Sequence, residues 1–311
     1  MRLLITGAHG QLGRHLRFAL HAEHGLTVDE VITSARSQRD EANKNPCDYT
    51  CDLSDAAAAQ AMLDEIQPDV VINAAAMTAV DAAEDEVELA NALNHHWPQQ
   101  AAAWCAQHQA KLMHFSTDYV FSGEPGRAWL EEDATVPQSV YGRSKLAGEQ
   151  AILASGCSAR ILRTAWLYSA LPGNFVHSML KLASQGQGLR VVSDQIGSPT
   201  WAGSLAQMAV SVLDHWSDDA PRARIFHASN RGAISWQQLA KTAIERGAKL
   251  GLIEAAVAVE PIASSEWPQR AIRPSWSVLD PSALEAATGY TVATCDLALE
   301  QCLQQWTHPP C

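Results

Sequence analysis

The chain has 311 residues, of which 47% are hydrophobic and 18% charged, a composition typical of a folded globular protein with a sizeable core. Its net charge of −12 argues against binding to nucleic acid or anionic membranes, and no apolar run is long enough to cross a bilayer. The N-terminus MRLLITGAHG does not resemble a signal peptide and the seven cysteines include no CxxC pair, so we expect a cytoplasmic protein with reduced thiols and no structural metal.

Short apolar segments alternate with helical patterns through the first half of the chain. We predict strands at 2–6, 28–35, 69–76, 111–117 and 159–168, with helices between them at 11–22, 55–66, 85–109 and 141–155. Most strand segments are continuously apolar, as expected for strands that are covered on both faces. This alternation predicts right-handed βαβ units and a doubly wound α/β fold with a parallel sheet.

The pattern becomes irregular after Tyr168. A helix at 202–216 and a strand at 224–229 are expected to return to the sheet, and a last helix is expected near 296–306. We therefore assign residues 1–168 and about 201–232 to the main domain, and about 169–200 and 233–311 to a smaller C-terminal lobe.

The first predicted strand leads into TGAHGQLG, where Gly7, Gly10 and Gly13 recur at every third residue before a helix. Glycines in this setting let the backbone approach a pyrophosphate and direct a helix N-terminus at its charge. The alternative is a glycine-rich turn with a purely structural role. The context favours an NAD(P)-binding Rossmann domain, and the spacing resembles the extended short-chain dehydrogenase/reductase superfamily.

The end of the second strand bears on the choice of cofactor. Arg36 and Arg39 follow this strand, whose end has no carboxylate, and Asp40 comes slightly later. An arginine here accommodates a 2′-phosphate, whereas an acidic residue accepts from the ribose hydroxyl of NAD. We therefore predict NADP(H), with NAD(H) as the alternative.

The string YGRSKLAGE places Tyr141 and Lys145 one helical turn apart, so they should share a face. A neighbouring cation favours the phenolate, which indicates a tyrosine able to exchange protons. The alternative is an exposed helix with an unrelated Tyr and Lys. Thr117 ends the preceding strand, at the carboxyl edge where doubly wound sheets bind ligands.

Longer strings narrow the family. NAAAMTAVDAAE, FSTDYVFSG, YGRSKLAGE, DQIGSPT and RPSWSVLD follow one another along almost the whole chain and resemble the dTDP-4-dehydrorhamnose reductase family. The resemblance implies an NAD(P)-dependent oxidoreductase that converts a nucleotide-sugar substrate, dTDP-4-dehydro-L-rhamnose, to dTDP-L-rhamnose. It implies no nucleic-acid or membrane partner and leaves a homodimer open.

The resemblance also assigns roles to residues. Tyr141 would donate a proton to the keto oxygen, Lys145 would hold the nicotinamide ribose and lower the pKa of Tyr141, and Thr117 would hydrogen-bond the substrate oxygen. The residues expected to contact the cofactor are Gly7, Gly10, Gln11, Leu12, Gly13, Arg36, Asp52, Leu53, Ala74, Ala75, Ala76, Tyr141 and Lys145. The residues expected to line the sugar pocket are Val80, Asp118, Tyr119 and Trp166.

Two of these positions have an alternative interpretation. Asp52 would bond the adenine amino group, but it could equally lie in the N-cap region of the next helix. Trp166 would stack on a sugar ring, but it could equally be a core tryptophan that follows a strand.

Arg273 is a candidate on charge grounds, because the pyrophosphate of the substrate needs a cation in this acidic protein. We expect Arg273, with Arg270, to reach across from the small lobe to the sugar nucleotide. The alternative is a surface arginine paired with Asp280 or Glu266.

Some positions depart from the family pattern. Met77 replaces an aromatic residue or histidine, and His15 stands where some bacterial members carry a glutamate linked to a magnesium-bridged dimer, so the need for magnesium stays open. His95 and His96 are interpreted as surface residues and not as a metal site. Two alternative functions remain: a non-catalytic NADP-binding subunit like the methionine adenosyltransferase beta subunit, or a reductase or epimerase of another nucleotide sugar.

Overall fold

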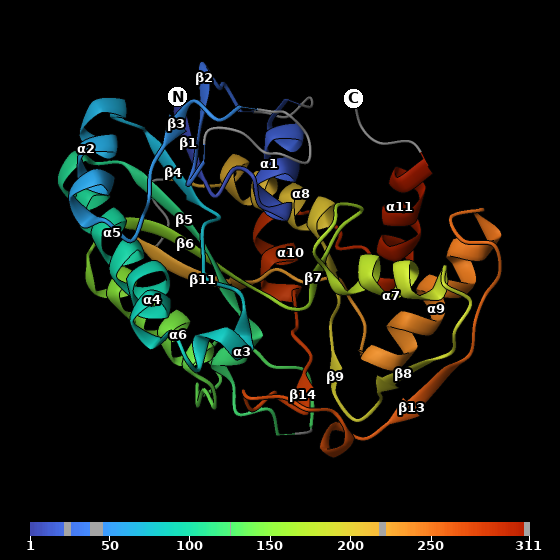
Figure 1. Ribbon diagram of the computed structural model, residues 1–311. Coiled ribbons are helices and arrows are strands. Elements are labelled where there is room, and N and C mark those ends of the chain that lie inside the picture. Colours follow the sequence, from blue (N-terminus) through green and yellow to red (C-terminus); the bar gives the residue numbers. More distant parts are fainter. Residues whose placement is uncertain (22–25, 38–45, 125, 218–221, 308–311) are drawn as a thin grey trace.

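The computed structural model describes residues 1–21, 26–37, 46–124, 126–217 and 222–307. Its centre is a seven-stranded parallel sheet of order β11-β6-β5-β4-β1-β2-β3 (Figure 1). The strands are β1 (Arg2–Thr6), β2 (Glu30–Ala35), β3 (Tyr49–Thr50), β4 (Val70–Asn73), β5 (Lys111–Thr117), β6 (Ser158–Thr164) and β11 (Ala223–His227). The predicted doubly wound sheet is confirmed, and β1 and β4 lie at the point where the strand order reverses.

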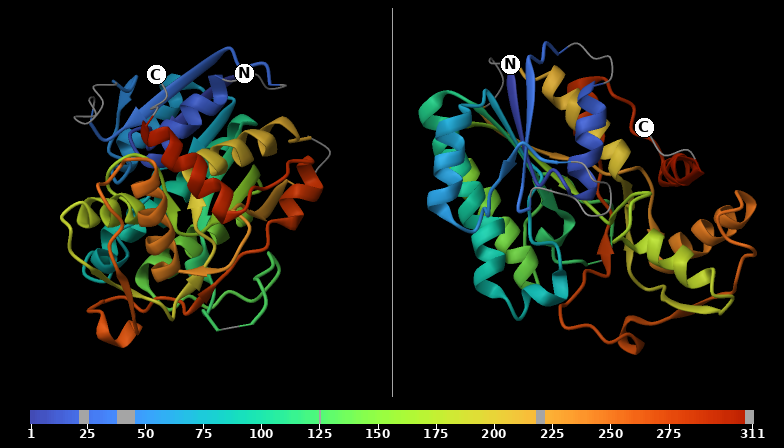
Figure 2. Two further views of the ribbon diagram at one scale, coloured as in Figure 1. Left: turned by 90° about the vertical axis from the view of Figure 1, so that its right-hand side faces the viewer. Right: turned by 45° about the horizontal axis from the view of Figure 1, so that its top comes forward.

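Helices cover both faces of this sheet (Figure 2). One face is covered by α1 (Gln11–His21), α8 (Ala202–Asp214) and α10 (Ser282–Thr288), whose leucines share a core with β1 and β4. The other face is covered by α2 (Ala56–Ile66), α5 (Trp97–His108) and α6 (Val140–Ala154). The strands are therefore buried on both sides, which explains their continuous apolar runs.

The single helix expected at 85–109 is divided in the structure. It contains α4 (Val87–Asn91), a π-helical turn η1 (Ala92–His96) and α5, and a short helix α3 (Val80–Ala83) precedes it. The π-helical turn buries Asn94 completely. A side chain at Gly148 of α6 would place its Cβ 2.2 Å from the Asn94 carbonyl oxygen, so only glycine lets α6 approach this turn.

The smaller lobe contains α7 (Phe175–Ala183), α9 (Trp236–Lys249) and α11 (Cys295–Thr307), which bury a separate apolar cluster. Its strand pairs are β8 (Leu189–Val192) with β13 (Val259–Ile262), β9 (Ile196–Gly197) with both β12 (Ile234–Ser235) and β14 (Trp276–Ser277), and β7 (Leu167–Tyr168) with β10 (Thr200–Trp201). Short 3₁₀ turns lie at η2 (Asp118–Val120) and η3 (Ser264–Glu266).

Neither α7 nor α9 was predicted from the sequence. Each begins at a clear cap, because the Asn174 side chain accepts from the His177 amide, and Ser235 forms a capping box with Gln238. None of the helices within the described ranges is long and apolar enough to cross a bilayer.

Candidate active site

The glycine loop forms a cradle at the carboxyl ends of β1 and β4. Gly7 has a φ of 70°, and a Cβ there would lie 2.7 Å from the Ala75 amide nitrogen. A Cβ at Gly13 would lie 2.3 Å from the Gly7 carbonyl oxygen. The loop, the end of β4 and the first turn of α1 are thus in backbone contact, and the free N–H groups at the start of α1 fit a pyrophosphate.

The other residues expected at this cradle have varied environments. Gly10 closes the turn by donating its amide hydrogen to the Gly7 carbonyl at 2.9 Å. Leu12 packs into the core, whereas the Gln11 side chain accepts from the Ser169 hydroxyl at 2.8 Å. Ala74 and Ala76, on either side of Ala75, are only partly buried.

The expected adenosine end of the site lies beyond β2. Arg36 is exposed immediately after Ala35, and its charge helps to keep the pKa of Asp52 low, although the main cause is hydrogen bonding to Ser54. The N-cap of α2 is Asp55, and Asp52 instead accepts from the Ser54 amide and hydroxyl. Leu53 is buried. Arg39 and Asp40 fall outside the described residues.

Thr117 and Tyr141 meet at the end of β5. Ser139 caps α6 by accepting from the Gly142 amide at 3.1 Å, which places Tyr141 in the first turn. Burial raises the pKa of Tyr141 to about 12, with a hydrogen bond to Thr117 acting in the opposite direction and the Asp118 charge adding to the rise. Lys145 is not among the groups that shift this pKa, so its expected lowering of the Tyr141 pKa stays a prediction.

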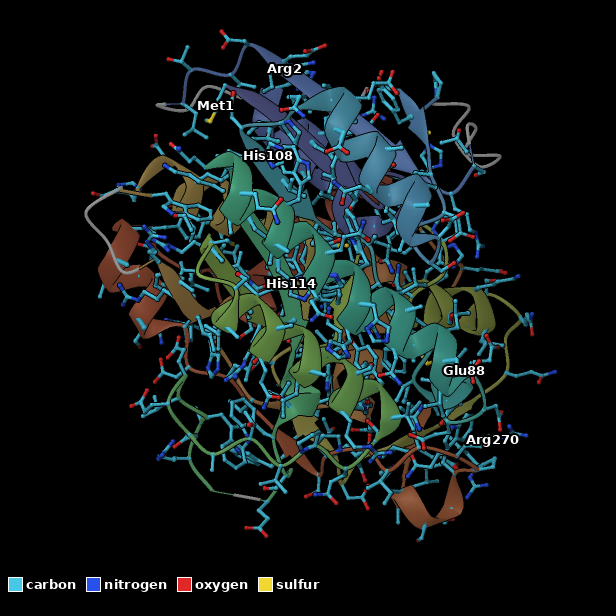
Figure 3. The ribbon with its side chains drawn as sticks, turned by 90° about the vertical axis from the view of Figure 1, so that its left-hand side faces the viewer. Met1, Arg2, Glu88, His108, His114 and Arg270 are labelled. Carbon is cyan, nitrogen blue, oxygen red and sulfur yellow. The ribbon has the colours of Figure 1, made fainter. Side chains whose placement is uncertain are left out.

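Lys145 lies one turn further along α6 and is only 1% exposed. Its Nζ donates to the Phe115 carbonyl at 2.6 Å and lies 3.2 Å from Nε2 of His114, which Figure 3 labels. Burial lowers the pKa of Lys145 to about 8, and the Glu149 charge partly opposes this. Glu149 itself is held in a buried bidentate ion pair with Arg163.

Three of the expected sugar-pocket residues surround Tyr141. Val80 and Tyr119 pack in the apolar cluster that contains Tyr141. The Tyr119 and Tyr141 rings meet edge to face, with their centroids 5.5 Å apart. Asp118 is 2% exposed and accepts from the Thr117 hydroxyl at 2.9 Å. Burial raises the pKa of Asp118 to about 6, against the opposing effect of the Ser277 and Thr117 hydroxyls.

Arg273 does extend from the small-lobe side to the main domain, where it meets Asp81 of α3. Its Nη1 and Nη2 donate to the two carboxylate oxygens at 3.0 and 2.6 Å, and the pair lowers the pKa of Asp81 to about 2. Arg270 pairs with Asp85 nearby, at the end of the molecule where Figure 3 labels Glu88.

The alternative partners suggested for Arg273 are engaged elsewhere. Asp280 accepts from the Ser282 amide at 2.8 Å, and Glu266 pairs with Arg190. The Tyr119 phenol lies near the Arg273 guanidinium, which connects this arginine to the tyrosine cluster.

Trp166 is held in an aromatic stack. Its ring stacks on the Trp236 ring, with the two centroids 3.6 Å apart and an angle of 5° between the ring planes. A Cβ on Gly197 would lie 2.5 Å from the Trp166 ring. Its backbone has a φ of 49°, which is a strained conformation for a bulky residue and separates β6 from β7. Trp166 is only partly buried, so this packing is compatible with both interpretations, and its contact with a sugar ring stays a prediction.

Sequence reasoning assigned no role to two buried polar residues beside the site. Asn94 accepts from the Met77 amide at 2.9 Å and donates to the Ser144 hydroxyl at 3.1 Å, so it fixes the loop after β4 to α6. His114 contacts Lys145 from the middle of β5. The apolar character of the surrounding strand hid His114, and only a search for polar residues inside apolar strands could have singled it out.

Comparisons with known proteins agree with this geometry. The family model described as RmlD substrate binding domain matches residues 1–308. The curated dTDP-4-dehydrorhamnose reductase of Mycobacterium tuberculosis strain H37Rv is 40% identical over 89% of this chain and 84% of its own, and that of Burkholderia thailandensis is 33% identical over 98% of each.

Two similar solved structures bear the same name. The Clostridium acetobutylicum protein has a TM-score of 0.84 at 34% identity and covers 99% of this chain and 100% of its own. The Bacillus anthracis protein, in complex with NADP, has a TM-score of 0.83 at 30% identity and covers 98% of this chain and 99% of its own. A UDP-glucose 4-epimerase of Thermus thermophilus, at 20% identity, shares the fold.

The buried carboxyl of Asp118 gives a testable stability effect. Its folded-state pKa of about 6 lies above that of the unfolded chain, so its contribution is present at low pH and lost as the pH rises through 6. We expect Asp118→Asn to raise the free energy of unfolding by about 1–3 kcal/mol at pH 7 and by much less near pH 4. Urea denaturation at the two pH values measures this.

Asp52→Asn is the matched control, because hydrogen bonding keeps the pKa of this exposed carboxyl low. It should not stabilise the protein at pH 7. An Asp118→Asn protein that is no more stable than the parent at pH 7 would contradict the burial argument.

Proposed function

The chain belongs to the dTDP-4-dehydrorhamnose reductase family, and we propose that it reduces the 4-keto group of dTDP-4-dehydro-L-rhamnose with NADPH. It is an NAD(P)-dependent oxidoreductase of nucleotide-sugar metabolism. The observation that carries the proposal is that Tyr141 lies beside Thr117 at the end of β5, with Lys145 one turn further along α6. A regulatory NADP-binding subunit would have no need of this set.

The cradle residues would hold the cofactor. The N–H groups at the start of α1 would face the pyrophosphate, the close backbone contacts at Gly7 and Gly13 hold the loop in the shape that allows this, and the exposed Arg36 would meet the 2′-phosphate. When NADPH is bound, it supplies the hydride for the keto carbon of the substrate. Lys145 would hydrogen-bond the nicotinamide ribose from its position on α6.

Tyr141 and Thr117 would act on the keto oxygen. A phenol with a raised pKa remains protonated at neutral pH, so Tyr141 is available as a proton donor. In the proposed complex, the Thr117 hydroxyl would turn its hydrogen from Asp118 to the keto oxygen and orient this oxygen toward Tyr141. Val80 and Tyr119 would shape the apolar side of the sugar pocket, and Asp118 holds the Thr117 hydroxyl until the substrate oxygen takes its hydrogen.

Oxidation of NADPH in the presence of a panel of nucleotide-linked 4-keto sugars tests the function directly. We expect the fastest reaction with the dTDP-linked 4-dehydro-6-deoxy sugar. A protein that binds NADPH but reduces no member of the panel would favour the regulatory alternative.

Replacement of Tyr141 by phenylalanine removes the proposed proton donor and little else. Because a general acid contributes about 10²–10⁴-fold to a rate, we expect kcat to fall by about that factor. The affinity for NADPH, measured by fluorescence titration, should hardly change. Undiminished turnover by Tyr141→Phe would end this mechanism.

Arg36→Ala tests the choice of cofactor. Loss of a charge-assisted hydrogen bond of about 1.5–3 kcal/mol should lower kcat/KM for NADPH by about 10- to 100-fold and leave NADH nearly unchanged. Arg2→Ala is the control, since it removes the same charge from the start of β1, where Arg2 pairs with Glu30. Equal losses with both cofactors would mean that Arg36 does not contact the 2′-phosphate.

Arg273→Ala tests the role of the small-lobe arginine. In the proposed complex, the guanidinium exchanges the half-exposed Asp81 carboxylate for the pyrophosphate of the sugar nucleotide. We expect the KM for the sugar nucleotide to rise at least about tenfold and the KM for NADPH to stay unchanged.

Two further variants separate this role from a structural one. Arg190→Ala breaks an exposed ion pair with Glu266 on the same lobe and should leave both KM values unchanged. Asp81→Asn frees the guanidinium and should not raise the KM for the sugar nucleotide. If Asp81→Asn and Arg273→Ala raise it equally, the pair only joins the two parts of the molecule.

A further inference from the structure

A buried chain of polar side chains leads from α5 to Lys145. Asn73, at the end of β4, and His114, in β5, are 1% and 0% exposed. The Asn73 Oδ1 atom lies 2.9 Å from Nε1 of Trp97 and 2.8 Å from the Thr6 hydroxyl. Its Nδ2 atom lies 2.9 Å from Nδ1 of His114, and His114 Nε2 lies 3.2 Å from Lys145 Nζ.

Trp97 fixes the direction of this chain. An indole N–H can only donate, so the Asn73 atom that faces it must be the oxygen. The Thr6 hydroxyl either donates or accepts and therefore does not decide the orientation. The Asn73 amide nitrogen, which can only donate, consequently faces Nδ1 of His114, and this nitrogen must accept.

The proton of neutral His114 therefore lies on Nε2 and points at Lys145. Burial, together with the Lys145 charge, lowers the pKa of His114 well below its usual range, so the ring stays neutral. An N–H that faces an ammonium group is unfavourable, whereas an amine can accept this hydrogen and still donate to the Phe115 carbonyl.

We propose that Trp97, through Asn73, fixes the Nε2–H tautomer of His114, and that this tautomer favours the neutral amine of Lys145. Trp97, Asn73 and His114 are then positioning residues that set the pH at which Lys145 acquires its charge. Only the consequence for turnover rests on the proposed function.

Other ionisable groups near Lys145 act in both directions. The Glu149 carboxylate favours the ammonium form, but Arg163 already neutralises it. The groups that face Lys145 or its immediate neighbours are His114 of β5, Asp118 of η2, Tyr141 and Glu149 of α6, and Arg163 of β6. The tautomer of His114 decides whether its contact with Lys145 favours the amine or the ammonium form.

Trp97→Phe tests the proposal in the full-length chain. Without the indole donor, Asn73 can rotate and present Oδ1 to His114, while its Nδ2 donates to the Thr6 hydroxyl. His114 should then carry its proton on Nδ1 and accept from the Lys145 ammonium. We expect the Lys145 pKa to rise by about one pH unit, a tenfold change in the ratio of ammonium to amine.

Two measurements read this change without turnover. Long-range ¹H–¹⁵N spectra of histidine-labelled protein identify the tautomer of His114, with the signal assigned by its loss in His114→Gln. The ¹³C titration of labelled lysine follows Lys145, assigned by its loss in Lys145→Met. In the active enzyme, the limb of the kcat/KM pH profile that reports Lys145 should move in the same direction.

Trp104→Phe is the matched control, since Trp104 is also a buried tryptophan of α5 but donates to Asp64 at 2.8 Å. It should lose similar packing and keep the parent tautomer. Asn73→Asp is a second variant that tests the proposal if Trp97→Phe does not fold. Both oxygens of the aspartate side chain accept, so His114 must carry its proton on Nδ1 to donate to it.

The tautomer decides the outcome. A parent protein with Nδ1–H on His114, or an unchanged tautomer in the variants, overturns the proposal whether or not the enzyme is active. A tautomer that switches in a protein that reduces no keto sugar would support the proposal and refute the proposed function.

Discussion

The site depends on direct backbone contact between α6 and the segments beside it. A Cβ on Gly142 would lie 2.3 Å from the Tyr119 carbonyl oxygen, and one on Gly148 would lie 2.2 Å from that of Asn94. Because neither glycine has a side chain, the backbone of α6 can pack directly against η2 and the π-helical turn. This packing places the Tyr141 hydroxyl at Thr117 and the Lys145 amine inside the sheet layer.

Local patterns in the sequence predicted the scaffold well. The alternation of apolar strands with helices, and the glycines at 7, 10 and 13, depend on neighbouring residues, and the sheet, the cradle and the Thr117–Tyr141 pair follow from them. Two contacts depended on distant partners and could not be predicted. The carboxylate that binds Arg273 is 192 residues away in the chain, and the stacking of Trp166 requires Trp236 from α9.

Charge was the property that the sequence described least well. A Tyr and a Lys one turn apart suggest a lowered phenol pKa, but that inference leaves out the burial of the phenol, which raises its pKa. The structure instead buries Lys145, Asp118 and the Glu149–Arg163 pair within one region. Each buried charge opposes folding unless it is paired, so this part of the molecule gives up stability to hold reactive groups in fixed positions.

The π-helical turn at Ala92–His96 also sets the length of its helix. A π turn adds one residue to an α-helix, so removal of a single residue there would restore a regular helix. That shorter helix would be easier to form, but it would turn Asn94 away from Met77 and Ser144. The extra residue of the turn is thus what keeps the loop after β4 tied to α6, so the shape of that loop depends on the length of this helix.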